Sequence, residues 1–222
     1  RREKIMIAEY GLLALIMGLV SAMALTTIPM WGAWRGNIAA MHSARPLSLS
    51  LFVFCAISFA MLCISFLSDD FSLVVVASNS NSMLPSFYKF SAVWGNHEGS
   101  MLLWILVLAS WTMAVAIFSS DLPVKLMARV LAVMGSISIG FISFSIFTSN
   151  PFARHLASAP LDGQELNPLL QDIGMIIHPP LLNMGYVAFA SAIVSAIAAL
   201  LGGRLDAAWA RWCRPWANVA WS

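Results

Sequence analysis

One histidine in this sequence is framed by its neighbours in a way that suits metal ligation. His178 is followed directly by Pro179 and Pro180. A residue before proline is biased away from helical backbone geometry, and prolines are tolerated in a helix's first turn, where N–H groups have no partners. We therefore predict that His178 lies where a loop becomes a helix. The positive end of that helix would disfavour the protonated imidazole and leave a nitrogen lone pair free for a metal.

The residues on either side of His178 place it at a membrane surface. Apolar residues recur at helical spacing between 166 and 177, with Asn167 as a candidate N-cap and Pro168 at the first helical position. This pattern predicts a short amphipathic helix lying on the membrane. Residues 181–201 then carry no charge and are long enough to cross a bilayer.

A solitary imidazole leaves more than one role open. His178 could simply donate a hydrogen bond to a backbone carbonyl at the interface. A metal role favours haem over zinc, because the sequence has no Cys/His/carboxylate set at zinc spacing. Haem iron needs only one or two axial ligands and an apolar wall.

A second pair of candidates precedes another apolar segment. His97 and Glu98 come just before a helix expected to begin with Gly99, and Trp94 stands three residues earlier. The pair could cap the helix by satisfying its exposed N–H groups. Alternatively it could hold a proton or a haem propionate near the outer surface. We expect His42 and His155, which lack rigid neighbours, to be solvated loop residues.

The composition indicates the class of protein that carries these residues. The 222 residues are 60% hydrophobic and only 10% charged, which excludes a soluble domain. The net charge of +2, with scattered basic residues, gives no indication of nucleic-acid binding. We predict an all-α polytopic transmembrane bundle, a single membrane domain over 1–222, with short interfacial helices on its outer side. Five complete spans are expected, with a sixth beginning near Pro215: about 7–30, 47–67, 100–119, 130–148 and 181–201.

The distribution of basic residues predicts the orientation. The connections at 31–46, 120–129 and 202–214 hold most of the loop Lys and Arg residues, so they are assigned to the cytoplasm. The outer loops are then about 68–99 and 149–180, and the N-terminus lies outside. The β-branched run at 71–77 in the first outer loop predicts extended chain.

The cysteines exclude two kinds of chemistry. Cys55 and Cys63 share one apolar segment, Cys213 stands among basic residues, and no C-x-x-C is present. The chain is therefore expected neither to exchange disulfides nor to carry thioether-linked haem itself. The missing initiator Met and the final Trp221-Ser222 lead us to expect a fragment or one piece of a split protein.

Several stretches together resemble a known family. They are VASNSNSMLP, AVWGNHEGSMLLW, IFTSNPFAR, DGQELNPLLQDIGMIIHPPLLNMGY and GRLDAAWARWCRPW. From about Trp31 onward the sequence is similar to the N-terminal part of CcmF, the haem lyase family of bacterial cytochrome c maturation. Small departures occur at Asn96, Ile173 and Asn183.

The resemblance implies a function and a set of partners. The chain would help to receive haem from the haem chaperone CcmE and to attach it to apocytochrome c cysteines on the periplasmic side of the bacterial inner membrane. Apocytochrome-handling subunits of the same system would assist. His178 matches the family's axial ligand for the incoming haem, with Pro179 and Pro180 framing it and His97, Glu98 and Trp94 as supporting candidates. No catalytic residue is assigned.

The resemblance also implies that the site is incomplete in these residues. Family members continue with a tryptophan-rich segment, a second periplasmic histidine and two intramembrane histidines that hold a resident b-type haem, none of which lies here. The rest of the lyase is thus an expected partner. Two alternatives remain: a close relative serving nitrite-reductase cytochromes, and a non-catalytic truncated scaffold of the assembly complex.

Overall fold

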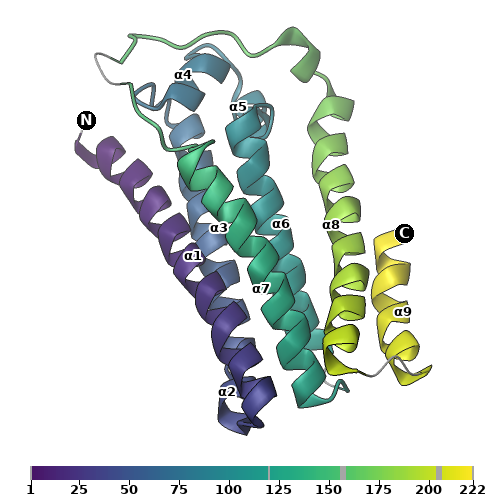
Figure 1. Ribbon diagram of the computed structural model, residues 1–222. Coiled ribbons are helices and arrows are strands. Elements are labelled where there is room, and N and C mark those ends of the chain that lie inside the picture. The colour runs from purple at the N-terminus through teal and green to yellow at the C-terminus, as the bar shows by residue number, and fades with distance from the viewer. Residues whose placement is uncertain (1, 120, 156–158, 204–206, 222) are drawn as a thin grey trace.

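Ten helical segments make up the fold of the described residues, which are all except 1, 120, 156–158, 204–206 and 222 in this computed structural model. Five are long: α1 (Arg2–Arg35), α3 (Ala44–Leu67), α6 (His97–Phe118), α7 (Val124–Phe147) and α8 (Ile173–Gly202) (Figure 1). The shorter ones are α2 (Ile38–His42), α4 (Val74–Asn79), α5 (Ser86–Ala92), the 3-10 helix η1 (Pro168–Leu170) and α9 (Ala207–Trp221).

The long helices confirm the predicted all-α polytopic membrane bundle. Within the described part of the chain, five helical stretches are long and apolar enough to cross a membrane. Helices suit this setting because each satisfies its backbone N–H and C=O groups internally. The last helix, α9, begins at Ala207, earlier than the expected Pro215, which lies inside it.

Helix α1 lies at one edge of the bundle, where it packs against α3 and α7 (Figure 1). Close approach of α1 and α7 depends on Gly135, where a Cβ atom would lie 2.8 Å from Thr26 Oγ1. On the other flank, α8 contacts α6, α7 and α9. Trp216 of α9 donates its indole N–H to Ser119 Oγ at 3.1 Å, which anchors α9 to the end of α6.

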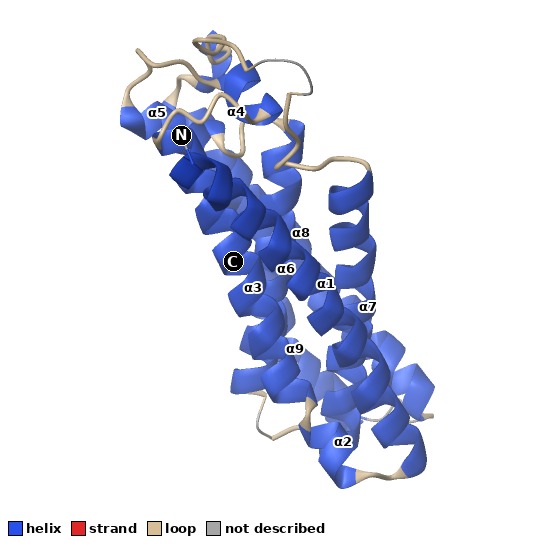
Figure 2. Ribbon diagram, turned by 90° about the vertical axis from the view of Figure 1, so that its left-hand side faces the viewer, coloured by secondary structure: helices blue, strands red, loops and turns tan. Residues whose placement is uncertain are grey.

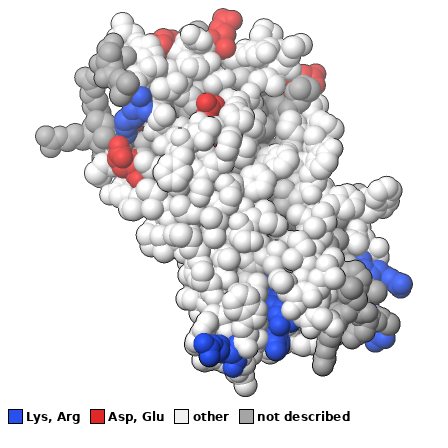
Figure 3. Space-filling view, viewed as in Figure 1, with Lys and Arg blue, Asp and Glu red and all other residues white. Residues whose placement is uncertain are grey.

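The connections between helices gather at two opposite ends. Figure 2 shows the α3–α6 and α7–α8 connections together at one end and α2 at the other. In Figure 3 acidic side chains gather at the first end, whereas most of the visible Lys and Arg lie at the second. The two loops predicted to share an outer face therefore do share one face of the molecule.

The prediction of extended chain at 71–77 is wrong for most of that stretch. Residues from Val74 onward form α4, and the pairing in this region is an isolated antiparallel bridge between Leu73 and Arg154. Val75 and Val76 are buried against the bundle, and this packing outweighs the β-preference of branched side chains.

Candidate functional site

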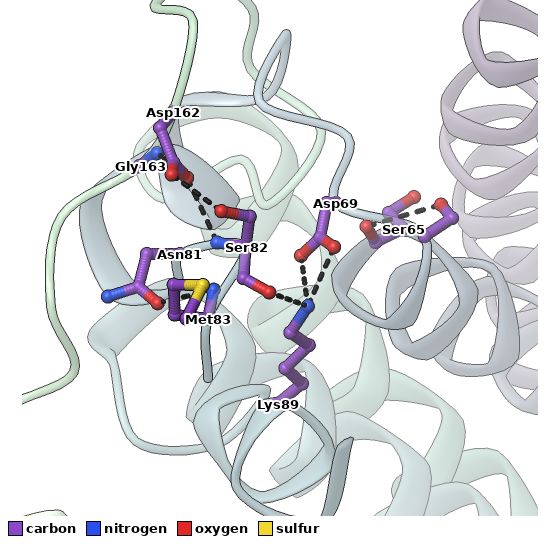
Figure 4. A network of polar contacts seen from close by, with 9 residues as sticks. Ser65, Asp69, Asn81, Ser82, Met83, Lys89, Asp162 and Gly163 are labelled. Atoms are coloured by element: carbon purple, nitrogen blue, oxygen red, sulfur yellow. Dashed lines mark hydrogen bonds and ion pairs between the residues drawn. The ribbon is translucent and has the colours of Figure 1, made fainter. Parts of the chain in front are cut away.

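The two outer loops are fastened to one another by polar contacts. The carboxylate of Asp162 accepts hydrogen bonds from the Ser82 backbone N–H at 2.9 Å and from the Ser82 hydroxyl at 2.6 Å (Figure 4). The backbone N–H of Gln164 donates to the Ala77 carbonyl at 2.7 Å. The Ser82 hydroxyl, with the backbone N–H groups of Ser82 and Gly163, holds the pKa of Asp162 below its usual value. The loops thus form one platform above the helices.

An ion pair braces the first loop from within. Lys89 of α5 lies 2.6 Å from Asp69, just beyond the end of α3, and also reaches the Ser82 carbonyl at 3.4 Å (Figure 4). Ser82 therefore contacts Lys89 on one side and Asp162 on the other. The ammonium group connects the end of α3 to the contact between the loops.

Asn96 organises the start of α6. Its side-chain oxygen accepts from the Gly99 N–H at 2.7 Å, and its amide nitrogen donates to the Ala92 carbonyl at 2.7 Å. A side chain at Gly99 would overlap the Val93 carbonyl, so this tight turn requires glycine. The helix begins at His97, two residues before the predicted start, because Asn96 caps it.

His97 and Glu98 therefore lie in the first turn of α6 rather than before it. The exposed His97 ring stands edge-on to Phe144 of α7, with centroids 6.3 Å apart. Phe144 also lines an apolar groove of about 400 Å³ between α6 and α7, together with Met101, Ser136, Ile137, Gly140 and Phe141. An imidazole thus marks the outer end of an apolar groove.

His178 occupies a different position from the one predicted. Asn167 does cap a helix, accepting from Leu169 N–H at 3.0 Å with Pro168 at its first position, but that helix is a single 3-10 turn. The membrane helix α8 then begins at Ile173, capped by Asp172, and runs without interruption through His178. His178 therefore lies inside α8, not at the boundary of a loop and a helix.

A side chain from the first outer loop donates a hydrogen bond to a carbonyl near the prolines of α8. Pro180 has no N–H to give to the Ile176 carbonyl four residues earlier. The indole N–H of Trp94 donates to that carbonyl at 3.1 Å. Phe90 packs edge-on against the Trp94 ring at 5.0 Å, and Gly95 lies against Leu170. The residues just before α6 and the residues around the start of α8, both expected on the outer face, are thus in direct contact.

The imidazole of His178 is exposed on an apolar flank of α8. Residues four before and three, four and seven after a helical residue share its face. At His178 these are Gly174, exposed Leu181 and Leu182, and Gly185, where an added Cβ would meet nothing within 4 Å. Small residues beside large apolar ones leave room for a flat apolar molecule against the ring.

The ligand inventory around His178 restricts the chemistry. Among the described residues, no group of three or more His, Cys, Asp and Glu side chains could hold a metal ion. Cys55 and Cys63 are buried in α3 and free. At His178 the described residues offer a single imidazole beside apolar side chains, which fits axial ligation of haem as a substrate and does not fit a zinc site.

Comparisons with known proteins agree with the motifs. The family described as cytochrome C assembly protein matches residues 94–222. The cytochrome c-type biogenesis protein CcmF of Pseudomonas aeruginosa is 60% identical over 98% of this chain, and that of Escherichia coli 52% over 95%. NrfE of Haemophilus influenzae, a cytochrome c-type biogenesis protein, is 41% identical over 97%.

A solved structure shows the same fold. The structure titled cytochrome c heme lyase CcmF aligns with a TM-score of 0.83 at 25% identity, covering 97% of this chain and 34% of that one. The chain likewise spans 33% of the Pseudomonas aeruginosa protein, so it corresponds to about a third of these relatives. On the match to more than half of its residues, this chain belongs to the cytochrome c assembly protein family, as a member of its CcmF branch.

Proposed function

We propose that this chain forms the haem-receiving part of a CcmF-type haem lyase in cytochrome c maturation. The observation that carries the proposal is the position of His178: an exposed imidazole among apolar side chains on a helix capped near its outer end. Such a site can bind the iron of an incoming haem axially while the porphyrin lies against Leu181 and Leu182. Pro179 and Pro180 frame the imidazole.

The chemistry requires positioning rather than a nucleophile from this chain. In thioether formation, an apocytochrome thiol adds across a haem vinyl group: a carbon–sulfur bond forms and the proton goes to the neighbouring vinyl carbon. The reacting sulfur belongs to the apocytochrome, so the lyase contributes axial ligation, orientation and exclusion of competing reactions. This division fits a chain whose cysteines in the membrane helices are buried.

The charge distribution supports a periplasmic location for the reaction. The basic end of the bundle is assigned to the cytoplasm and the acidic end, with both outer loops, to the periplasm of a bacterial inner membrane. Partners there are the haem chaperone CcmE, apocytochrome c and the apocytochrome-handling subunits. The remaining portion of the lyase supplies further haem ligands and any resident b-type haem.

His97, Glu98 and Trp94 support the same site in this proposal. Since Asn96 caps α6, the imidazole and carboxylate of the first turn are available to accept a proton or to orient a haem propionate through water. The indole N–H of Trp94 donates a hydrogen bond to the Ile176 carbonyl of α8, the helix that carries His178.

Replacing His178 tests the proposal. In the full-length lyase with its assembly system, His178→Ala should reduce cytochrome c yield to background while the protein remains in the membrane. His155→Ala is the matched control, because His155 is an exposed outer-loop histidine. Normal yield from His178→Ala would refute the ligand role and favour the scaffold alternative. The lower identity to NrfE than to CcmF disfavours the nitrite-reductase alternative.

A further inference from the structure

A carbonyl inside α8 receives its hydrogen bond from outside the helix. Pro180 is the eighth residue of α8, beyond the first turn in which N–H groups have no partners anyway. Its ring takes away the donor for the Ile176 carbonyl and crowds that oxygen. Ile176 is buried, with 6% of its surface exposed, so its carbonyl has little access to solvent.

Trp94 is placed to supply the missing donor. Its indole nitrogen, which can only donate, lies 3.1 Å from the Ile176 oxygen. The indole is half-buried and held from the side by Phe90. The backbone at Gly95 approaches Leu170 so closely that an added Cβ would lie 3.0 Å from its Cδ1 atom. The segment carrying the indole is therefore fixed relative to the start of α8.

We propose that Trp94 is a positioning residue for His178: its indole N–H takes the place of the N–H that Pro180 lacks, and so fixes the helical turn that carries the imidazole. Its role for haem rests on the proposed function of His178. Each residue of a helix is rotated by about 100° about the helix axis, so residues two apart, such as Ile176 and His178, lie on nearly opposite sides. The bond on the buried side at Ile176 therefore holds the turn while His178, on the opposite side, stays exposed.

A double-mutant cycle on Trp94 and Pro180 tests directly whether the indole N–H replaces the missing proline N–H. The variants are Trp94→Phe, Pro180→Ala and the two together, each in lipid nanodiscs, with hydrogen–deuterium exchange measured over residues 173–186. Trp94→Phe keeps the aromatic ring and removes the donor, so amide protection in this segment should fall roughly fivefold. Trp104→Phe is the matched control, because Trp104 lies within α6 and packs on Phe141 instead.

The Pro180→Ala background should cancel the effect. Alanine restores an N–H that can bond the Ile176 carbonyl within the helix, so adding Trp94→Phe should then change protection little. An equal loss of protection in both backgrounds would overturn the proposal, as would a loss no larger than that of Trp104→Phe. This part of the test uses no haem.

Haem titration tests the consequence for His178. Trp94→Phe should weaken haemin binding and alter the absorption spectrum of the bound haem, and it should add nothing in a His178→Ala background. If the exchange cycle behaves as expected but Trp94→Phe weakens haemin binding equally with and without His178, the positioning role is refuted. If His178→Ala itself leaves haemin binding unchanged, the proposed function fails, whereas the hydrogen-bond replacement measured by exchange stands.

Discussion

Replacing Lys89 with methionine would remove a buried cation that braces the first outer loop. The Lys89 side chain is 8% exposed, that of Asp69 is 27% exposed, and both carboxylate oxygens lie within 2.7 Å of the ammonium nitrogen. Removing one partner of a fully buried pair costs about 3–5 kcal/mol, because the other charge stays buried alone. Since Asp69 keeps some access to solvent, we expect Lys89→Met to lower the free energy of unfolding by about 2–3 kcal/mol.

Denaturant unfolding in one detergent, followed by tryptophan fluorescence, measures this loss. Lys125→Met is the matched control, because Lys125 is exposed at the start of α7 and its loss should change stability by about 0.5 kcal/mol or less. Adding Asp69→Asn to Lys89→Met should recover part of the loss, since asparagine carries no charge for the ammonium group to balance and tolerates the left-handed backbone at φ 53°. A Lys89→Met protein as stable as the Lys125→Met control would refute the reasoning.

Three further predictions concern the outer face. Because Asn96 caps α6, Glu98→Gln should lower stability by only about 0.3–1 kcal/mol, yet Glu98→Gln and, more severely, His97→Ala should lower cytochrome c yield at unchanged protein abundance. If cytochrome c yield falls only in proportion to the amount of protein in the membrane, His97 and Glu98 have a purely structural role. The depressed pKa of Asp162 means that its contribution to loop docking is complete above the usual 3.8 and is lost as pH falls through the lower folded-state pKa. Limited proteolysis of the loops on acidification should show this loss in the wild type and not in Asp162→Asn. Finally, a membrane-impermeant thiol reagent should label cysteines placed at exposed Met83 and Leu161 from the periplasm, and one at Lys125 only from the cytoplasm. Labelling at 125 from the periplasm would reverse the orientation.

The membrane helices could be predicted because their signal is local. A run of about twenty apolar residues has few alternatives to a spanning helix, and each of the five predicted spans coincides with a long helix of the structure, two of them ending one residue beyond it. Boundaries were less accurate. Helix α6 starts two residues earlier than predicted because Asn96 caps it by accepting from the Gly99 N–H, and an asparagine at that position is a local signal that indicates the earlier start.

The position of His178 could not be predicted from its immediate neighbours. The bias of a residue before proline favours a helix boundary there, and Asn167 and Pro168 gave a plausible earlier helix. The bias is outweighed by the Asp172 cap upstream and by an indole from another loop. A signal was present nonetheless: a proline in a helix frees the carbonyl four residues earlier, and this predicts a donor near Ile176.

The contacts between the outer loops impose an order on the biogenesis of this protein. Trp94 and Ile176 are 82 residues apart, and Ser82 and Asp162 are 80 apart, with the α6–α7 hairpin inserted between them. At synthesis rates of about 5–20 residues per second, the first loop waits roughly 4–16 s for its partner segment to emerge. The Lys89–Asp69 pair, 20 residues apart, can close during that interval. The first loop can therefore be braced, with Asn96 already capping α6, before α8 arrives to accept the indole hydrogen bond.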